Sequence, residues 1–258
     1  MQRQIGSSRM AGFTLIETMV SVIIGSMLLT ALYQIWTSNQ RETDRIQDKT
    51  EFRDRAALAT TQVNRSITMA GFGMSKMDVI AKGVGNSCDT LKIYSNPSEI
   101  RTTLIDTARI SSNSILVFKD SGFTVGGLIG ITDSIHQEYV RVSQMSGDTA
   151  SGYTVTLASA LANLYLPGVP DIYPVQKELI YIDDNRHSLI RKLDSRQINL
   201  VTGINDFRID MRDAFGNPAT SYRKIRVVTF NVTGTYKAPA GTPSTMSFSS
   251  TVIPRNIL

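Results

Sequence analysis

The stretch Gly12-Phe13-Thr14-Leu15-Ile16-Glu17 joins a short basic segment to a long apolar run in a chain of 258 residues. The apolar run extends from Phe13 to Trp36, and Glu17 is its one charged residue. A run of this length can cross a bilayer as a helix. An acid near the centre of a membrane helix costs roughly 2.5–3.5 kcal/mol on insertion scales, so Glu17 is a functional candidate. Because neither segment offers it a nearby cation, we expect its partner on another molecule.

The residues before the apolar run look like the start of an export signal. They contain Arg3 and Arg9 and no acid. An ordinary secretory signal has an apolar region of only about 7–15 residues, followed by a cleavage site of small residues. Here the run is longer and no such site follows it. The residues by themselves therefore allow an uncleaved signal-anchor helix.

The same six residues at a basic-to-apolar junction resemble the processing site of type IV prepilins and pseudopilins. The resemblance implies that a prepilin peptidase cuts between Gly12 and Phe13 and that Phe13 is then N-methylated. It also implies that Glu17, the fifth residue of the mature chain, pairs during assembly with the Phe13 amine of a neighbouring subunit. Coulomb attraction between two such charges is strong in a low-dielectric environment.

The helical pattern continues beyond the apolar run. Residues 37–56 carry interleaved charges, as on a solvated helix face. One apolar stripe recurs at spacings of three or four residues, formed by Phe52, Ala56, Ala59, Val63 and Ile67. Such a stripe predicts a helix that packs on a following domain. Ala70-Gly71-Phe72-Gly73 should then stop the helix, after about 55 residues and about 80 Å.

After Gly73, short β-rich runs alternate with turns. Ser146-Gly147-Asp148 and Gly216-Asn217-Pro218 have the composition of turns, and Asp183–His187 joins two runs as a hairpin. The expected strands are Leu91–Tyr94, Ile115–Phe118, Leu128–Thr132, Tyr139–Met145, Tyr153–Leu157, Glu178–Ile182, Ser188–Leu193, Phe207–Met211, Ile225–Tyr236 and Thr245–Ile253.

These patterns predict an α+β fold. A long N-terminal helix, transmembrane in its first half, packs on a mainly antiparallel β head domain, as in pilins. The expected divisions are a leader at 1–12, a transmembrane and assembly helix at 13–36, its amphipathic continuation at 37–73 and a β-rich globular head at 74–258.

Several later segments narrow the resemblance. Ser66–Met74, Leu189–Lys192, Leu200–Phe207 and Pro254–Asn256 are similar to PilW-type minor pilins and to the J-type minor pseudopilin of type II secretion. The resemblance implies a minor pilin in the initiation or tip complex of type IV pilus assembly, with a minor pseudopilin of type II secretion as the alternative. The implied partners are prepilin peptidase, other minor and major pilins through the N-terminal helix, and the inner membrane. The head would lie in the periplasm and later in the pilus or pseudopilus.

Catalytic and metal-binding patterns are weak. The sequence contains no G-x-S-x-G elbow, P-loop or H-E-x-x-H motif. His136 and His187 lie in separate polar stretches without metal-ligand spacing. Asp183-Asp184-Asn185 offers calcium ligands, but a hairpin turn explains the same residues. We expect no enzyme activity, no cofactor and no metal; a membrane-anchored enzyme stays the alternative.

Charge and cysteine content add two further expectations. The net charge is +5, and residues 186–226 are rich in Arg and Lys with acids interspersed. General surface charge explains this better than nucleic-acid binding, although a DNA-binding pilus component stays an alternative. Cys88 is the one cysteine, so it is either buried or paired with another chain.

Overall fold

The computed structural model describes residues 14–74, 79–84, 88–118, 122–133, 135–148, 151–219, 224–237 and 243–256. Gly12 and Phe13 lie outside the described residues. The chain divides into two compact units. The first comprises Met1–Thr50 with Lys237–Thr242, and the second Glu51–Tyr236 with Pro243–Leu258.

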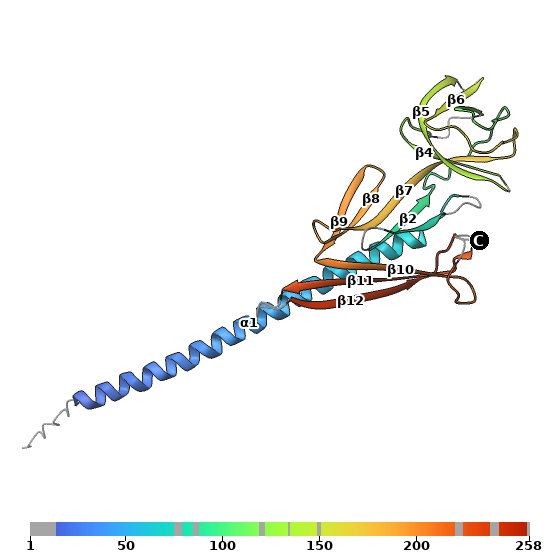
Figure 1. Ribbon diagram of the computed structural model, residues 1–258. Helices are drawn as coiled ribbons and strands as arrows, with labels where there is room; N and C mark the ends of the chain where they lie inside the picture. The colour runs from blue at the N-terminus through green and yellow to red at the C-terminus, as the bar shows by residue number, and fades with distance from the viewer. Residues whose placement is uncertain are drawn as a thin grey trace, which may run out of the picture. The chain divides into compact units, whose positions relative to one another are not determined.

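One continuous α-helix, α1, runs from Leu15 to Thr68 (Figure 1). Within the first unit, its large apolar side chains up to Trp36 are exposed. Hydroxyl groups along the same segment donate to the preceding turn; Ser21 bonds the Glu17 carbonyl and Thr30 the Ser26 carbonyl, each at 2.8 Å. A helix that satisfies its polar groups internally and exposes apolar side chains is suited to lipid or to other helices.

The second unit contains the end of α1, whose predicted apolar stripe is confirmed. Phe52, Ala56, Ala59, Val63 and Ile67 are all buried. The predicted stop is also confirmed, because Gly71 takes a φ of 75° and donates its N–H to the Tyr94 carbonyl at 2.9 Å. A side chain at Gly73 would lie 2.2 Å from the Asn96 carbonyl oxygen, so that turn requires glycine.

Two antiparallel sheets form the rest of the second unit. The larger has nine strands in the order β1-β2-β7-β4-β5-β6-β3, with β8 pairing with β7 and β9 pairing with β8. Its strands are β1 (Ile80–Val84), β2 (Asp89–Ser95), β3 (Ser114–Val117), β4 (Leu128–Thr132), β5 (Gln137–Asp148), β6 (Gly152–Leu157), β7 (Asp171–Asp183), β8 (Ser188–Leu193) and β9 (Arg196–Thr202). The smaller sheet has the order β10 (Ile204–Arg212), β11 (Val227–Lys237) and β12 (Pro243–Val252). The long helix with mainly antiparallel sheets confirms the predicted α+β fold.

The buried side chains form two clusters. The larger joins the last turns of α1 to both sheets, and Phe52 lies 6.0 Å from the Tyr236 ring and 6.1 Å from the Phe248 ring. The second cluster is built from residues between Leu104 and Ile172. Strand β7 contributes to both clusters, so it connects the two parts of the core.

All ten predicted strands overlap observed strands, but one predicted turn is wrong and two strands were not predicted. Ser146-Gly147-Asp148 lies inside β5, which pairs with β6 up to Asp148. Gly147 allows β5 and β6 to approach each other closely, because a Cβ at this position would lie 2.3 Å from the Gly152 carbonyl oxygen. The unpredicted strands β1 and β9 carry weak patterns and form through pairing with β2 and β8.

Candidate functional site

The N-terminal site begins with a capping interaction that involves Glu17, the acid of the apolar run. Thr14 precedes the first helical residue, and its backbone N–H donates to Glu17 Oε2 at 3.2 Å. In return, the Glu17 N–H donates to Thr14 Oγ1 at 3.3 Å. Reciprocal bonds of this kind form a capping box, which satisfies backbone N–H groups at a helix start.

Glu17 therefore has a local role that was not predicted, although the Thr-x-x-Glu signature is visible in the sequence. Both side-chain contacts of Glu17 use Oε2. Among the described residues, no ion pair neutralises its carboxylate and no hydrogen bond reaches Oε1. One carboxylate oxygen thus completes the cap, and the other is not engaged by residues 14–256 that the structure describes.

The helix that follows Glu17 is compatible with a bilayer. In the part of the chain that the structure describes, α1 is the helix that is long and apolar enough to cross a membrane. Its most apolar 18-residue segment contains no buried residue. This apolar surface and the cap at Thr14 and Glu17 together make the start of α1 the candidate site for membrane anchoring and for helix packing.

In the second unit, a buried carboxylate fixes α1 to the large sheet. Glu178 of β7 is 7% exposed, and its Oε1 accepts the Ser66 hydroxyl at 2.5 Å. Arg191 of β8 donates from Nε to Oε1 at 2.6 Å and from Nη2 to Oε2 at 3.2 Å. These bonds to Glu178 raise the pKa of Arg191, although burial opposes them. Both oxygens of the Glu178 carboxylate are therefore bonded, so this carboxylate connects α1, β7 and β8 and serves the structure of the head.

A second buried carboxylate joins the two sheets. Asp89 of β2 is 4% exposed and accepts the backbone N–H of Ile209 in β10 at 2.7 Å. Lys82 of β1 pairs with Asp89 at 2.9 Å and donates to the Ile209 carbonyl at 2.8 Å. Because both groups are satisfied within the head, this pair also acts in folding and offers no site for a ligand.

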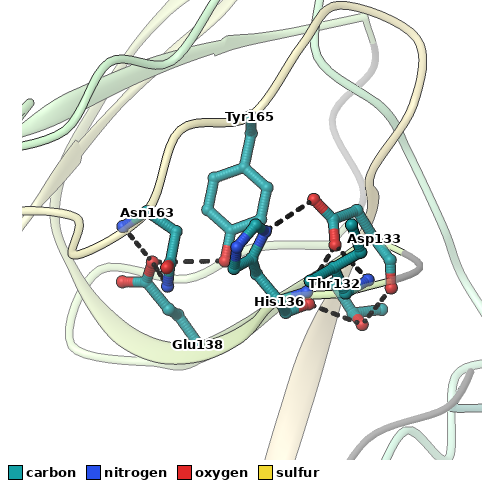
Figure 2. Close-up of polar contacts among 7 residues, drawn as sticks. Thr132, Asp133, His136, Glu138, Asn163 and Tyr165 are labelled. Carbon is teal, nitrogen blue, oxygen red and sulfur yellow. Dashed lines mark hydrogen bonds and ion pairs between the residues drawn. The ribbon is translucent and has the colours of Figure 1, made fainter.

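A cluster of polar side chains in the nine-stranded sheet surrounds His136 (Figure 2). His136 Nδ1 lies 3.2 Å from Asp133 Oδ2, and its ring meets the Tyr165 ring edge-on at 6.3 Å between centroids. Burial opposes ionisation of Asp133, but the N–H groups of His136 and Ile135 outweigh it and lower the pKa of Asp133. The Asp133 carboxylate thus closes a turn and orients the imidazole.

Glu138 organises the neighbouring loop in the same cluster (Figure 2). Its carboxylate accepts the backbone N–H groups of Ala162 and Asn163 at 2.9 and 2.8 Å. It also accepts the Asn163 side-chain amide at 2.7 Å and the Tyr165 hydroxyl at 3.2 Å. Burial and the Glu138 charge raise the pKa of Tyr165, so the phenol remains neutral and donates. The cluster has the bonding of a loop anchor rather than of a catalytic centre.

The other residues considered for chemistry are separate from this cluster. His187 lies in the turn between β7 and β8 with a φ of 45°. Asp183 accepts the Asn185 N–H at 3.1 Å and lies 3.8 Å from Arg186, so its carboxylate shapes the hairpin. Across the ranges the structure describes, no three His, Cys, Asp or Glu side chains gather as a metal site.

Cys88 is buried, as one of its two expected states requires. Its Sγ lies 3.6 Å from the Asn205 carbonyl oxygen and 3.7 Å from Asp206 Oδ1. It therefore packs where the start of β2 meets β10, within the larger hydrophobic cluster.

Several cations of the basic stretch at residues 186–226 form ion pairs. Its described ion pairs are Arg186 with Asp183, Arg191 with Glu178, Arg208 with Asp206, and Arg212 with Asp210. These four cations are therefore neutralised within the protein.

The comparisons with known proteins bear on the start of the chain. The family model of the prokaryotic N-terminal methylation motif matches residues 7–33. No curated protein and no solved structure shows significant similarity to the chain. The matched residues span the junction at Gly12 and Phe13, the cap at Thr14 and Glu17, and most of the exposed apolar segment of α1. The chain thus carries at its N-terminus the signal of a type IV pilin-like prepilin, which fits a membrane-anchored, pilin-like protein.

Proposed function

We propose that this chain is a minor pilin that acts in the initiation or tip complex of type IV pilus assembly. A prepilin peptidase removes residues 1–12, and Phe13 becomes the methylated N-terminus. Residues 13–36 anchor the protein in the inner membrane and then pack with helices of other pilins. Residues 37–73 support the head at 74–258, which contacts other minor subunits and catalyses no reaction.

The observation that carries this proposal is the junction itself. Gly12-Phe13-Thr14-Leu15-Ile16-Glu17 stands where a basic segment meets an apolar helix, inside the matched methylation motif. A membrane anchor alone requires neither glycine before Phe13 nor an acid at membrane level. An enzyme that used α1 only as an anchor would gain nothing from Gly12, and from Glu17 it would gain only the capping box.

The bonding of Glu17 supports its role in assembly. The capping box occupies Oε2. Oε1 can accept the charged Phe13 amine of a neighbouring subunit without breaking the cap. The pairing would neutralise a carboxylate that is otherwise costly in lipid. A single side chain can thus start its own helix and bind the next subunit.

Processing is tested by mass. Glycine lets a peptidase approach the backbone closely, because it has no side chain. We expect membrane-extracted protein from the native host to begin at methylated Phe13, and Gly12→Val to retain residues 1–12. Gly6→Val, which changes another glycine of the leader, should be processed normally. An intact mass that includes residues 1–12 in the unmodified protein would exclude the proposal.

Charge pairing is tested by comparing three changes at the cap. Glu17→Gln keeps an oxygen that can close the capping box but removes the charge. Glu17→Ala removes both, and Thr14→Ala weakens the cap while keeping the charge. We expect all three proteins to be cleaved and inserted. Both Glu17 variants should be depleted from the sheared fibre fraction, whereas Thr14→Ala should be incorporated.

One result would contradict the pairing, and another would contradict the assignment to a pilus. Normal incorporation of Glu17→Gln at native expression would assign Glu17 to the cap alone. Unchanged fibres, but failure to secrete exoproteins in a strain that lacks the protein, would favour the type II secretion alternative.

A further inference from the structure

Four cationic side chains from four strands share one face of the nine-stranded sheet. Lys92 of β2 and Lys192 of β8 are the cross-strand partners of the same β7 residue, Leu179. Lys177 lies two residues along β7, and Arg141 of β5 pairs with Leu128, which pairs with Val175 of β7. Directly paired residues, and residues two apart on one strand, project from the same face. We call these four side chains the basic face.

The basic face is not neutralised within the protein. Among the described residues, several other cations of the head pair with carboxylates, as in Lys82–Asp89 and Arg191–Glu178. None of the three lysines has a carboxylate oxygen within 4 Å in the described ranges. Asp194 accepts the Lys177 backbone N–H at 3.3 Å and forms no such pair with its ammonium group.

The like charges of the basic face oppose folding, so they point to a role in binding rather than in stability. Burial lowers the pKa of Lys177, and the charges of Lys92, Arg141 and Lys192 lower it further. The three neighbouring charges thus lie close enough to Lys177 to affect its titration. Like charges held together without a counter-charge are the normal composition of a site for an anionic partner.

Aromatic rings border the same face. Tyr94 is the cross-strand partner of Lys177, and its ring stacks on Tyr139 of β5 at 4.4 Å between centroids. Burial raises the pKa of Tyr94, so its hydroxyl stays a neutral hydrogen-bond donor beside the lysines. Cations with neighbouring phenols suit phosphate oxygens, which accept bonds from both.

We propose that the basic face binds the phosphate backbone of DNA without reading its sequence. Lys92 and Lys192 lie two strand spacings apart, about 9–10 Å, and Lys177 is displaced from their row by about 7 Å along β7. Cations spread in this way match successive phosphates better than one small anion. The basic face lies on a sheet and has no protruding helix that could enter a groove of DNA. It would therefore contact the DNA phosphate backbone and not the base edges.

DNA fits this surface better than an acidic protein does. Lysine is depleted at the centre of protein–protein interfaces, whereas it is a common ligand of nucleic-acid phosphates. The inference is independent of pilus assembly, because it concerns residues outside α1. With its head on a pilus, as proposed above, the protein would bind extracellular DNA to that pilus.

Binding is tested with the full chain in a non-ionic detergent. The probe is a labelled duplex of about three helical turns, about 30 base pairs, titrated by fluorescence anisotropy at several salt concentrations. We expect Lys92→Gln, Lys177→Gln and Lys192→Gln together to weaken binding. The slope of log affinity against log salt should fall in magnitude by about 3, since each phosphate contact contributes about 0.9.

A matched triple variant controls for net charge. Lys49→Gln, Arg109→Gln and Arg196→Gln remove three exposed cations that form no ion pair in the described structure and lie outside the basic face. This protein should keep the salt slope of the unmodified chain. Replacing the three face lysines with arginine should also preserve binding, because the charge is kept.

The proposal is overturned by any of three results. The first is that the unmodified chain binds no DNA at low salt, and the second is that the two glutamine triples lose affinity equally. The third is that polyglutamate binds with the same dependence on the face while DNA does not. Near-UV circular dichroism of the head tyrosines verifies folding of each variant. If the glutamine triple does not fold, the arginine triple and Lys92→Gln alone carry the comparison.

Discussion

The hydroxyl group of Ser66, in the last turns of α1, donates a hydrogen bond to the buried carboxylate of Glu178 in β7; Ser66 Oγ lies 2.5 Å from Glu178 Oε1. The two residues are 112 positions apart in sequence. The same Oε1 accepts Arg191 Nε, so one oxygen connects the helix, β7 and β8. Helix attachment in this protein therefore depends on a buried charge as well as on the apolar stripe.

The first prediction concerns this joint. Glu178→Gln removes the charge and leaves Arg191 without its counter-ion in a setting where its side chain is only 25% exposed. We expect the free energy of unfolding to fall by about 3 kcal/mol, since losing one member of a buried pair costs about 3–5 kcal/mol. Ser66→Ala should cost about 1–2 kcal/mol. Urea unfolding followed by near-UV circular dichroism measures both.

A surface pair provides the control for this prediction. Asp210 and Arg212 form an ion pair at 2.7 Å with side chains 48% and 52% exposed. Asp210→Asn should therefore change stability by less than about 1 kcal/mol. Equal effects of Asp210→Asn and Glu178→Gln would show that the joint does not hold α1.

The second prediction concerns the close contact between Gly234 and the Phe52 ring. A Cβ on Gly234 would lie 2.6 Å from both Phe52 Cζ and the Gly203 carbonyl oxygen. Gly234→Ala should destabilise the head by about 1–3 kcal/mol through overpacking. Phe52→Leu shortens the side chain, so the double variant should lose less stability than the sum of the single variants. Strict additivity in thermal unfolding would exclude the proposed contact.

The third prediction separates the anchor from the head. A 41–258 fragment lacks the exposed apolar segment but keeps Phe52, Val63 and Ile67, which contribute about 1.5–3 kcal/mol each when buried. It should be a soluble, cooperatively folding monomer. A 75–258 fragment loses those side chains and Ser66, so it should expose the covered face and aggregate. Sedimentation velocity and thermal scans compare the fragments, and equal stability would refute helix packing on the head.

The fourth prediction follows from the lowered pKa of Lys177. The folded protein binds this proton less tightly than the unfolded chain, whose Lys177 has the ordinary pKa of 10.5. Stability therefore rises with pH between the folded pKa and 10.5. Lys177→Met, which keeps the apolar stem, should raise the melting temperature at pH 7. This gain should shrink toward pH 10.5 and at high salt.

Lys49→Met, at an exposed position of α1, is the control for that prediction and should show no such pH dependence. A lower melting temperature for Lys177→Met at neutral pH would mean that packing of the lysine stem outweighs repulsion.

Local patterns in the sequence predicted the parts of the fold that depend on neighbouring residues. The stripe from Phe52 to Ile67 was recognisable because helical spacing places its members on one face. The glycine stop at Gly71 and the hairpin after Asp183 were recognisable for the same reason, since turn chemistry acts over a few residues. The motif at Gly12 and Phe13 is also local, and it is the part that the family comparison covers.

Features created by strand register could not be predicted. The basic face combines Lys92, Arg141, Lys177 and Lys192, which become neighbours only once β2, β5, β7 and β8 pair in this register. The bond between Ser66 and Glu178 has the same origin. The capping box is different, because Thr14 and Glu17 are close in sequence. The place of Glu17 in an apolar run favoured an interpretation in which its one partner lies on another molecule.

The shared strand β7 also makes the head modular. Ser95 and Gln176 are cross-strand partners, so the long segment between them, which itself supplies β3, β4, β5 and β6, begins and ends at one point of the large sheet. That segment forms its own hydrophobic cluster between Leu104 and Ile172. It occupies the place of a hairpin loop and behaves as an inserted cassette. A lineage can therefore enlarge, exchange or shorten this cassette while the helix-binding part of the head stays the same.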